Sequence, residues 1–123
     1  MHDVARGSLL ETLLEIEHLS QAGVDVDGGR LPVAAIAARF ADAFQFDPLR
    51  TISPGTSAVT IPVEQLPAAS KALRELGVPF SNIGKAVSGS EVRLPEGTTV
   101  TECAEVRCEE DDLARPWALY PRS

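Results

Sequence analysis

Residues 1–21 read MHDVARGSLLETLLEIEHLSQ, a short charged segment that leads directly into a leucine-rich stretch. Over residues 9–20 the apolar side chains recur at the spacing of one broad helical face, which predicts an amphipathic helix. Ser8 is placed to act as its N-cap, Glu11 three residues later completes a capping-box pattern, and Gly23 is placed to end it. The fold therefore begins with a helix that follows a charged, glycine-containing turn.

Helical and strand patterns alternate along the rest of the chain. A second helix is predicted from near Pro32, which suits a first-turn position, and it ends before the Asp47-Pro48 break. A third helix has Pro67 in or near its first turn and Gly77 as its stop. The remaining segments are predicted strands at 24–27, 57–61, 82–87, 91–94 and 98–106, and a short acidic-capped helix with a tail over 109–123, broken at Pro116.

The order of these elements indicates the fold class. Helices interleave with strands along most of the chain, and S-G-S and P-E-G turns separate the last three strands. We expect one late antiparallel hairpin among them. We therefore expect an α+β fold, a mixed α/β sandwich whose helices pack on a mixed sheet, as a single domain over residues 1–123. Trp117 and Tyr120 in the C-terminal tail are expected to dock on the body of that domain.

The charge balance restricts the partners that the chain can have. Eighteen acidic residues against 11 basic residues give a formal net charge of −7. A nucleic-acid or anionic-membrane surface needs a basic patch, and none is visible, so neither partner is expected. The sequence has no apolar stretch of about 18 residues and no basic segment followed by an apolar run, so we expect neither a transmembrane helix nor a signal peptide. We expect a cytoplasmic protein.

Two sets of residues are of types that bind metals. Cys103 and Cys108 lie five apart, which on a strand places them on opposite faces, so we expect two reduced cysteines and no disulfide. Glu11, Glu15 and His18 share one helical face, which in helical bundles can build a carboxylate-rich metal site. Such a site needs matching ligands from a second helix, and the other helices offer few. A solvated polar face is the favoured interpretation, and no metal ligand is assigned.

The segment before the first helix is the strongest candidate for chemistry. Gly7 precedes a helix N-terminus, where unpaired amides and the helix dipole favour an anion. Arg6 could add a bidentate contact to phosphate or carboxylate, and His2 and Asp3 could orient a substrate, bind a metal or transfer a proton. The alternative is an ordinary capped helix with a charged lead-in. The chain has no G-x-S-x-G, Walker A or G-x-G-x-x-G motif, so no catalytic residue is assigned.

Four segments, taken in order, resemble the C-terminal domain of the aminoimidazole ribonucleotide (AIR) synthase superfamily. They are MHDVARGSLLETLLEI at 1–16, LPV at 31–33, DPLRTISPGTSAVTIP at 47–62, and the helix that leads through LREL into NIGKAV at 82–87. The first is similar to that domain's opening signature, His/Arg-Asp-x-Thr-x-Gly-Gly-Leu. The resemblance covers about residues 1–87 and leaves 88–123 as a β-hairpin with the C-terminal helix and tail. The Asp-Pro-Leu and Ile-Ser-x-Gly segments are most similar to the hydrogenase-maturation carbamoyl dehydratase branch.

The resemblance implies an ATP-dependent enzyme, in which phosphoryl transfer activates a substrate oxygen before the phosphate is displaced. In this superfamily a separate N-terminal domain holds most of the ATP and Mg²⁺ ligands and forms the dimer. We therefore expect no cofactor in this chain itself and no activity from this chain alone. The implied partner is an N-terminal AIR synthase-like domain, in the same or a separate chain, or a second copy. The domain's opening loop closes over the phosphates, which implies phosphate or substrate contacts by His2, Asp3, Arg6, Gly7 and Ser8.

Three departures from the family pattern support a second hypothesis. Ala5 stands where the signature has a hydroxyl residue, Ser8 replaces its second glycine, and the chain ends in P-R-S without the terminal cysteine of the carbamoyl dehydratase. Self-directed thiocyanate formation is therefore not expected. The alternative function is a stand-alone, non-catalytic binding or scaffold domain that acts with a partner. Because Met1 corresponds to a domain junction in the family, we expect a domain of a longer protein; the alternative is a gene that encodes only this half.

Overall fold

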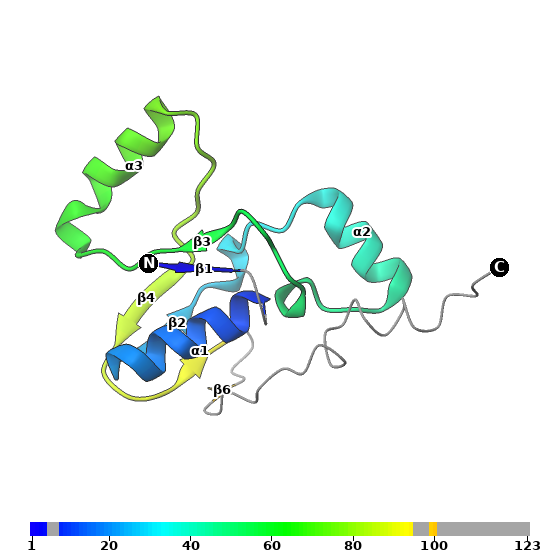
Figure 1. Ribbon diagram of the computed structural model, residues 1–123, viewed down its shortest axis with the longest axis horizontal. Helices are drawn as coiled ribbons and strands as arrows, with labels where there is room; N and C mark the ends of the chain where they lie inside the picture. The colour runs from blue at the N-terminus through cyan, green and yellow to red at the C-terminus, as the bar shows by residue number, and fades with distance from the viewer. Residues whose placement is uncertain (5–7, 95–98, 101–123) are drawn as a thin grey trace.

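Two sheets and three α-helices make up the part of the chain that the computed structural model describes, residues 1–4, 8–94 and 99–100 (Figure 1). The strands are β1 (His2–Asp3), β2 (Gly23–Val26), β3 (Ser57–Ala58), β4 (Gly84–Val87), β5 (Val92–Arg93) and β6 (Thr99–Val100). The helices are α1 (Ser8–Ser20), α2 (Ala35–Phe44) and α3 (Leu66–Glu75), with 3-10 turns η1 (Gly28–Arg30), η2 (Pro48–Arg50) and η3 (Val63–Gln65). This arrangement confirms the α+β prediction. The predicted strand beyond Val100, both cysteines, and the C-terminal helix and tail lie outside the described residues.

The core lies between α1 and the larger sheet. Leu13 and Leu14 of α1 form one buried cluster with Val24 and Val26 of β2 and Val92 of β5. Alternate residues of a strand face opposite sides of its sheet, so both valines of β2 point to the same side, as the V-D-V-D alternation predicted. The predicted leucine stripe of the first helix therefore forms the helical side of the core.

β2 is the inner strand that organises this sheet, whose order is β4-β2-β5-β6. It pairs antiparallel with β4, in the register Val24↔Ala86, and parallel with β5, in the register Val24↔Val92. β5 and β6 pair antiparallel, which confirms the predicted late hairpin. β4 and β5, which the S-G-S turn separates in the sequence, do not pair with each other, because β2 lies between them. A turn signal shows only that the chain reverses direction, whereas the pairing partner depends on which strand is buried beside it.

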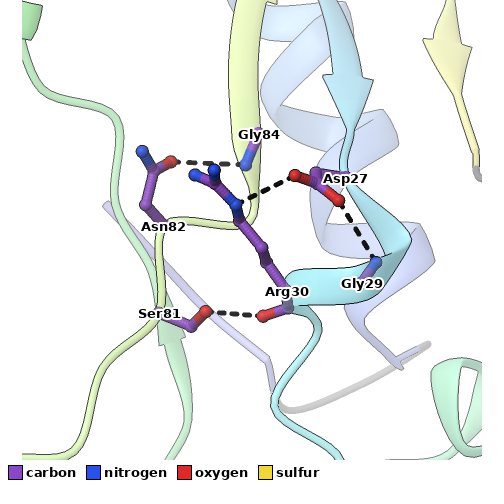
Figure 2. A network of polar contacts seen from close by, with 6 residues as sticks. All are labelled: Asp27, Gly29, Arg30, Ser81, Asn82 and Gly84. Carbon is purple, nitrogen blue, oxygen red and sulfur yellow. Dashed lines mark hydrogen bonds and ion pairs between the residues drawn. The ribbon is translucent and has the colours of Figure 1, made fainter.

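Close backbone contact holds the start of β4 against β2. A side chain at Gly84 would place its Cβ 2.2 Å from the Asp25 carbonyl oxygen, so only glycine fits. Nearby, Arg30 Nε lies 2.9 Å from an Asp27 carboxylate oxygen, and the Ser81 hydroxyl donates to the Arg30 carbonyl (Figure 2). The ion pair is local to η1, whereas the Ser81–Arg30 hydrogen bond joins η1 to the segment that enters β4.

Two predicted elements are shorter in the structure. α2 begins at Ala35 and not near Pro32, because Leu31 and Ala34 are extended, with ψ of 123° and 138°. Ala34 is the N-cap residue of α2, and its extended backbone sets the start of the helix at Ala35. The strand predicted over 57–61 is reduced to the two residues of β3, since its partner β1 is itself two residues long. No sequence pattern predicted β1.

α1 begins one residue earlier than predicted, at Ser8, which has a φ of 80°. An N-cap residue is normally extended, so Ser8 does not start the helix in the way that the capping-box prediction requires. Glycine adopts this left-handed conformation freely, whereas other residues do so at a cost of about 1–3 kcal/mol. Ser8 also occupies the position of the second glycine in the signature that the sequence resembles.

Replacing Leu14 by alanine should lower the free energy of unfolding by about 2–5 kcal/mol, because it removes a core side chain that is 2% exposed and leaves a cavity. Leu19→Ala is the matched control in the same helix, where the side chain is 78% exposed, and it should change stability by less than about 0.5 kcal/mol. Urea unfolding followed by circular dichroism measures both values. Equal losses in the two variants would contradict the described orientation of α1.

Ser8→Gly should raise the free energy of unfolding by about 0.5–1 kcal/mol, because glycine relieves the left-handed backbone strain. Ser70→Gly makes the same exchange inside α3 and should instead lower stability by about 0.5 kcal/mol through helix propensity. The same urea titration shows whether each substitution raises or lowers the free energy of unfolding. If both substitutions lower stability, the left-handed backbone at Ser8 is not strained in a way that glycine relieves.

Candidate functional site

The N-terminal segment is held against a turn that lies far away in the sequence. β1 pairs antiparallel with β3 in the register His2↔Ala58, and the two strands lie side by side in Figure 1. Beyond β1, the Val4 amide donates to the Thr56 carbonyl at 2.8 Å, and the Ser53 amide donates to the Val4 carbonyl at 3.2 Å. Val4 is buried, so this contact is part of the packed structure. The segment that leads into α1 therefore has a fixed neighbour.

That neighbour, the Ser53–Thr56 turn, has two hydroxyl side chains that contact each other. Ser53 Oγ lies 2.8 Å from Thr56 Oγ1, and the Thr56 amide donates to the Ser53 carbonyl at 3.1 Å. Gly55, with a φ of 85°, provides the left-handed residue of the turn. No predicted site residue lies here. The family resemblance included the Ile-Ser-x-Gly segment, but nothing in the local sequence shows that this turn meets the N-terminus.

His2 is oriented by α1. Its Nε2 lies 2.5 Å from a carboxylate oxygen of Glu15, and its Nδ1 lies 2.8 Å from the Asp3 backbone carbonyl. A carbonyl only accepts hydrogen bonds, so Nδ1 is the donor in that contact. Both ring nitrogens are therefore engaged within the chain, and the ring connects β1 to α1.

Asp3 and Ser8, two of the predicted site residues, differ in solvent exposure. Asp3 is exposed on β1. Ser8 is 1% exposed at the first turn of α1, and the Thr12 hydroxyl donates to its carbonyl at 3.0 Å. Glu11 is buried in the same first turn, where its carboxylate interacts favourably with the helix dipole. This carboxylate opposes the binding of a second anion at the helix N-terminus.

The structure places three of the five predicted site residues. His2 and Asp3 form β1, and Ser8 starts α1, which contacts β1. Arg6 and Gly7 lie outside the described residues. A phosphate site shared by all five residues therefore stays a prediction.

The alternative metal site on α1 has no support in the described part of the chain. Glu15 pairs with His2, Glu11 is buried, and His18 is exposed. Across residues 1–4, 8–94 and 99–100, no group of three His, Cys, Asp or Glu side chains is placed to hold a metal ion. Within the same residues, no helix has the length and apolar character needed to cross a membrane.

The hollows among the described residues are small or open. One cavity of about 20 Å³ has room for about one water molecule and none for a substrate. It is lined by Leu9, Leu10, Leu13, Val26, Leu31, Asp47, Leu49 and Leu94. A second depression, between the end of α1 and the end of β4, is open to solvent. The described residues therefore do not by themselves enclose a substrate.

The fold is similar to part of a larger solved protein. A chain in the crystal structure of a HypE-HypF complex matches with a TM-score of 0.64 at 22% sequence identity, covering 81% of this chain and 34% of that chain. At this identity the similarity shows the fold alone. This chain spans about a third of the length of that neighbour. A comparison with curated proteins gave no match.

A family model matches most of the chain. It describes the AIR synthase related protein, C-terminal domain, and it matches residues 1–95, which include every element from β1 to β5. The match confirms the resemblance expected over about residues 1–87 and extends it through β5. The chain therefore belongs to the AIR synthase-related C-terminal domain family.

Proposed function

We propose that this chain is the phosphate- and substrate-facing C-terminal domain of an ATP-dependent, AIR synthase-like protein. The observation that carries the proposal is the family match over residues 1–95, which includes the N-terminal segment and the turn that contacts it. An N-terminal AIR synthase-like domain, in the same or a separate chain, would supply the rest of the site. The fold match spans only 34% of the neighbour in the HypE-HypF complex, which supports a larger functional unit.

The arrangement around β1 brings hydroxyl groups beside the N-terminal segment. The β1–β3 pairing brings the Ser53–Thr56 turn beside the segment that leads into α1. The Ser53 and Thr56 hydroxyls are the donors that this turn would offer to a phosphate. The backbone amides of Val4, Ser53 and Thr56 already donate within the chain. Arg6, within that segment, would add a charge-assisted contact to phosphate. Asp3, exposed on β1, would orient the substrate or accept a proton.

ATP would supply the phosphoryl group, and Mg²⁺ would neutralise charge on its phosphates. Following the family resemblance, we assign the Mg²⁺ ligands to the N-terminal domain. This chain would close over the phosphates and exclude water from them. It would have no activity alone.

Within the superfamily we favour a role in hydrogenase maturation. The two segments that resemble that branch both lie near the site in the structure. Asp47 accepts from the Leu49 amide at 2.9 Å and so starts η2, which contacts α1. The Ile-Ser-x-Gly segment forms the turn that contacts Val4. These signature residues therefore shape the surroundings of the N-terminal segment.

A stand-alone binding or scaffold domain is the second candidate, and the position of Ser8 favours it. The Ser8 side chain is 1% exposed, so its hydroxyl is turned away from a ligand on the surface. Ala5 has no hydroxyl to donate. A helix start without these donors binds phosphate less tightly. In this candidate the chain binds a protein partner or a second copy and no nucleotide.

Arg6→Ala should slow phosphate release about tenfold or more in the complex of this chain with its N-terminal AIR synthase-like domain, because a charge-assisted hydrogen bond contributes about 1.5–3 kcal/mol. Arg39→Ala is the matched control, since Arg39 is exposed on a different element, α2, and it should leave the rate unchanged. The measurement is release of inorganic phosphate from Mg-ATP, with each domain assayed alone and together.

Three outcomes decide between the candidates. An active complex in which Arg6→Ala has no effect, or the same effect as Arg39→Ala, would contradict a phosphate-facing role. Turnover of Mg-ATP by this chain alone would contradict the proposed division of the site between two domains. A stable complex that binds no nucleotide by calorimetry would favour the scaffold.

A further inference from the structure

The outward face of α2 is apolar and uncovered by the described residues. Ile36, Phe40 and Phe44, which we call the α2 ridge, recur every four residues and are 59%, 51% and 52% exposed. The rings of Phe40 and Phe44 stack with centroids 5.8 Å apart and planes 6° from parallel. Ala41 is the buried residue of this helix. α2 therefore packs on the domain through a small side chain and presents its large ones outward.

A continuous row of large apolar side chains marks a surface that something covers. Isolated exposed apolar residues are common on soluble proteins, but a contiguous apolar patch indicates a binding surface. The spacing of the α2 ridge is that of a core-facing helix stripe. A segment that covers it should therefore present apolar and aromatic side chains.

Two exposed arginines near the α2 ridge favour a covering segment that carries negative charge. Arg39 lies on α2 next to Phe40, and Arg50 ends η2, which contacts α2. Both are exposed, and within the described part of the chain neither forms an ion pair. The covering segment should combine apolar side chains with negative charge.

One stretch of this chain has that chemistry. Residues 109–123 read EEDDLARPWALYPRS, in which four consecutive acidic residues precede Leu113, Trp117 and Tyr120. Trp117 and Tyr120 follow Pro116, so the stretch places two aromatic side chains just after its acidic start. The family match ends at residue 95 and therefore assigns this stretch no role.

We infer that residues 109–123 dock on the α2 ridge, with their apolar side chains against the phenylalanines and their acidic run beside the arginines. The nine residues from Val100 to Glu109 span up to about 30 Å when extended, which sets the reach of the segment. Attachment to the same chain gives the segment an effective concentration in about the millimolar range, which favours it over a separate partner. The inference does not depend on the nucleotide role proposed above.

Trp117 reports on this contact, because it is the only tryptophan in the chain. In the native full-length chain its emission should be blue-shifted from that of the urea-unfolded chain, and acrylamide should quench it several-fold less. Phe40→Asp/Phe44→Asp should return the emission to the unfolded position while the circular dichroism spectrum stays native. Val63→Asp/Leu76→Asp is the matched control at positions 74% and 75% exposed, and it should leave the emission unchanged.

A charge reversal gives a second, milder test. Arg39→Glu leaves the α2 ridge in place but repels the acidic run, so it should shift the emission part of the way to the red, and more so at low salt. Lys71→Glu on α3 is its control and should have no effect. Should the double aspartate variant lose its native circular dichroism spectrum, Arg39→Glu carries the test.

Three results would overturn the inference. The first is a native Trp117 as accessible to acrylamide as in the unfolded chain. The second is an equal red shift in the Val63→Asp/Leu76→Asp variant, which would mean that Trp117 is covered by a surface other than α2. The third is an emission maximum that changes with protein concentration, which would assign the α2 ridge to a second copy of the chain.

Discussion

The packing of α1 on the inner strand β2 is the contact on which the rest of the structure depends. Leu13 and Leu14 cover the two valines of β2, and β2 in turn provides hydrogen bonds along both edges for β4 and β5. Strands of two to four residues are not stable without such cover. The same helix carries the candidate site, because its first turn begins at Ser8 and its Glu15 holds the His2 ring. Core and site therefore share one element.

The candidate site is an assembly of segments that are distant in sequence. β1 exists only because β3 supplies its hydrogen-bonding partner, and the Ser53–Thr56 turn then lies against Val4. Such pairing fixes where the N-terminal segment runs before it enters α1. A left-handed Ser8, buried at the junction, completes the change of direction. Glycine in the family signature meets this backbone requirement without strain.

The described core is small for the number of apolar side chains that the helices carry. α3 has no buried residue in the structure, and Val63 and Leu76 beside it are 74% and 75% exposed. An isolated helix of ten residues is marginal in water, so packing on further protein is the expected source of its stability. Arg74, which lies 5.5 Å from the centre of the Phe80 ring, provides one local contact. These faces agree with the proposal that the domain acts within a larger unit.

The local sequence by itself determined the elements whose signals, such as apolar periodicity or a proline and glycine at the ends, lie within one short segment. The leucine stripe predicted α1, the V-D-V-D alternation predicted β2, and Pro67 with Gly77 marked the limits of α3. Only the tertiary structure decided that β2 separates β4 from β5, that β3 is two residues long, and that the predicted Ser8 cap is buried with a left-handed backbone. Each of these depends on which distant segment lies alongside, and the energy of that choice comes from burial against α1. No pattern within a single segment contains that information.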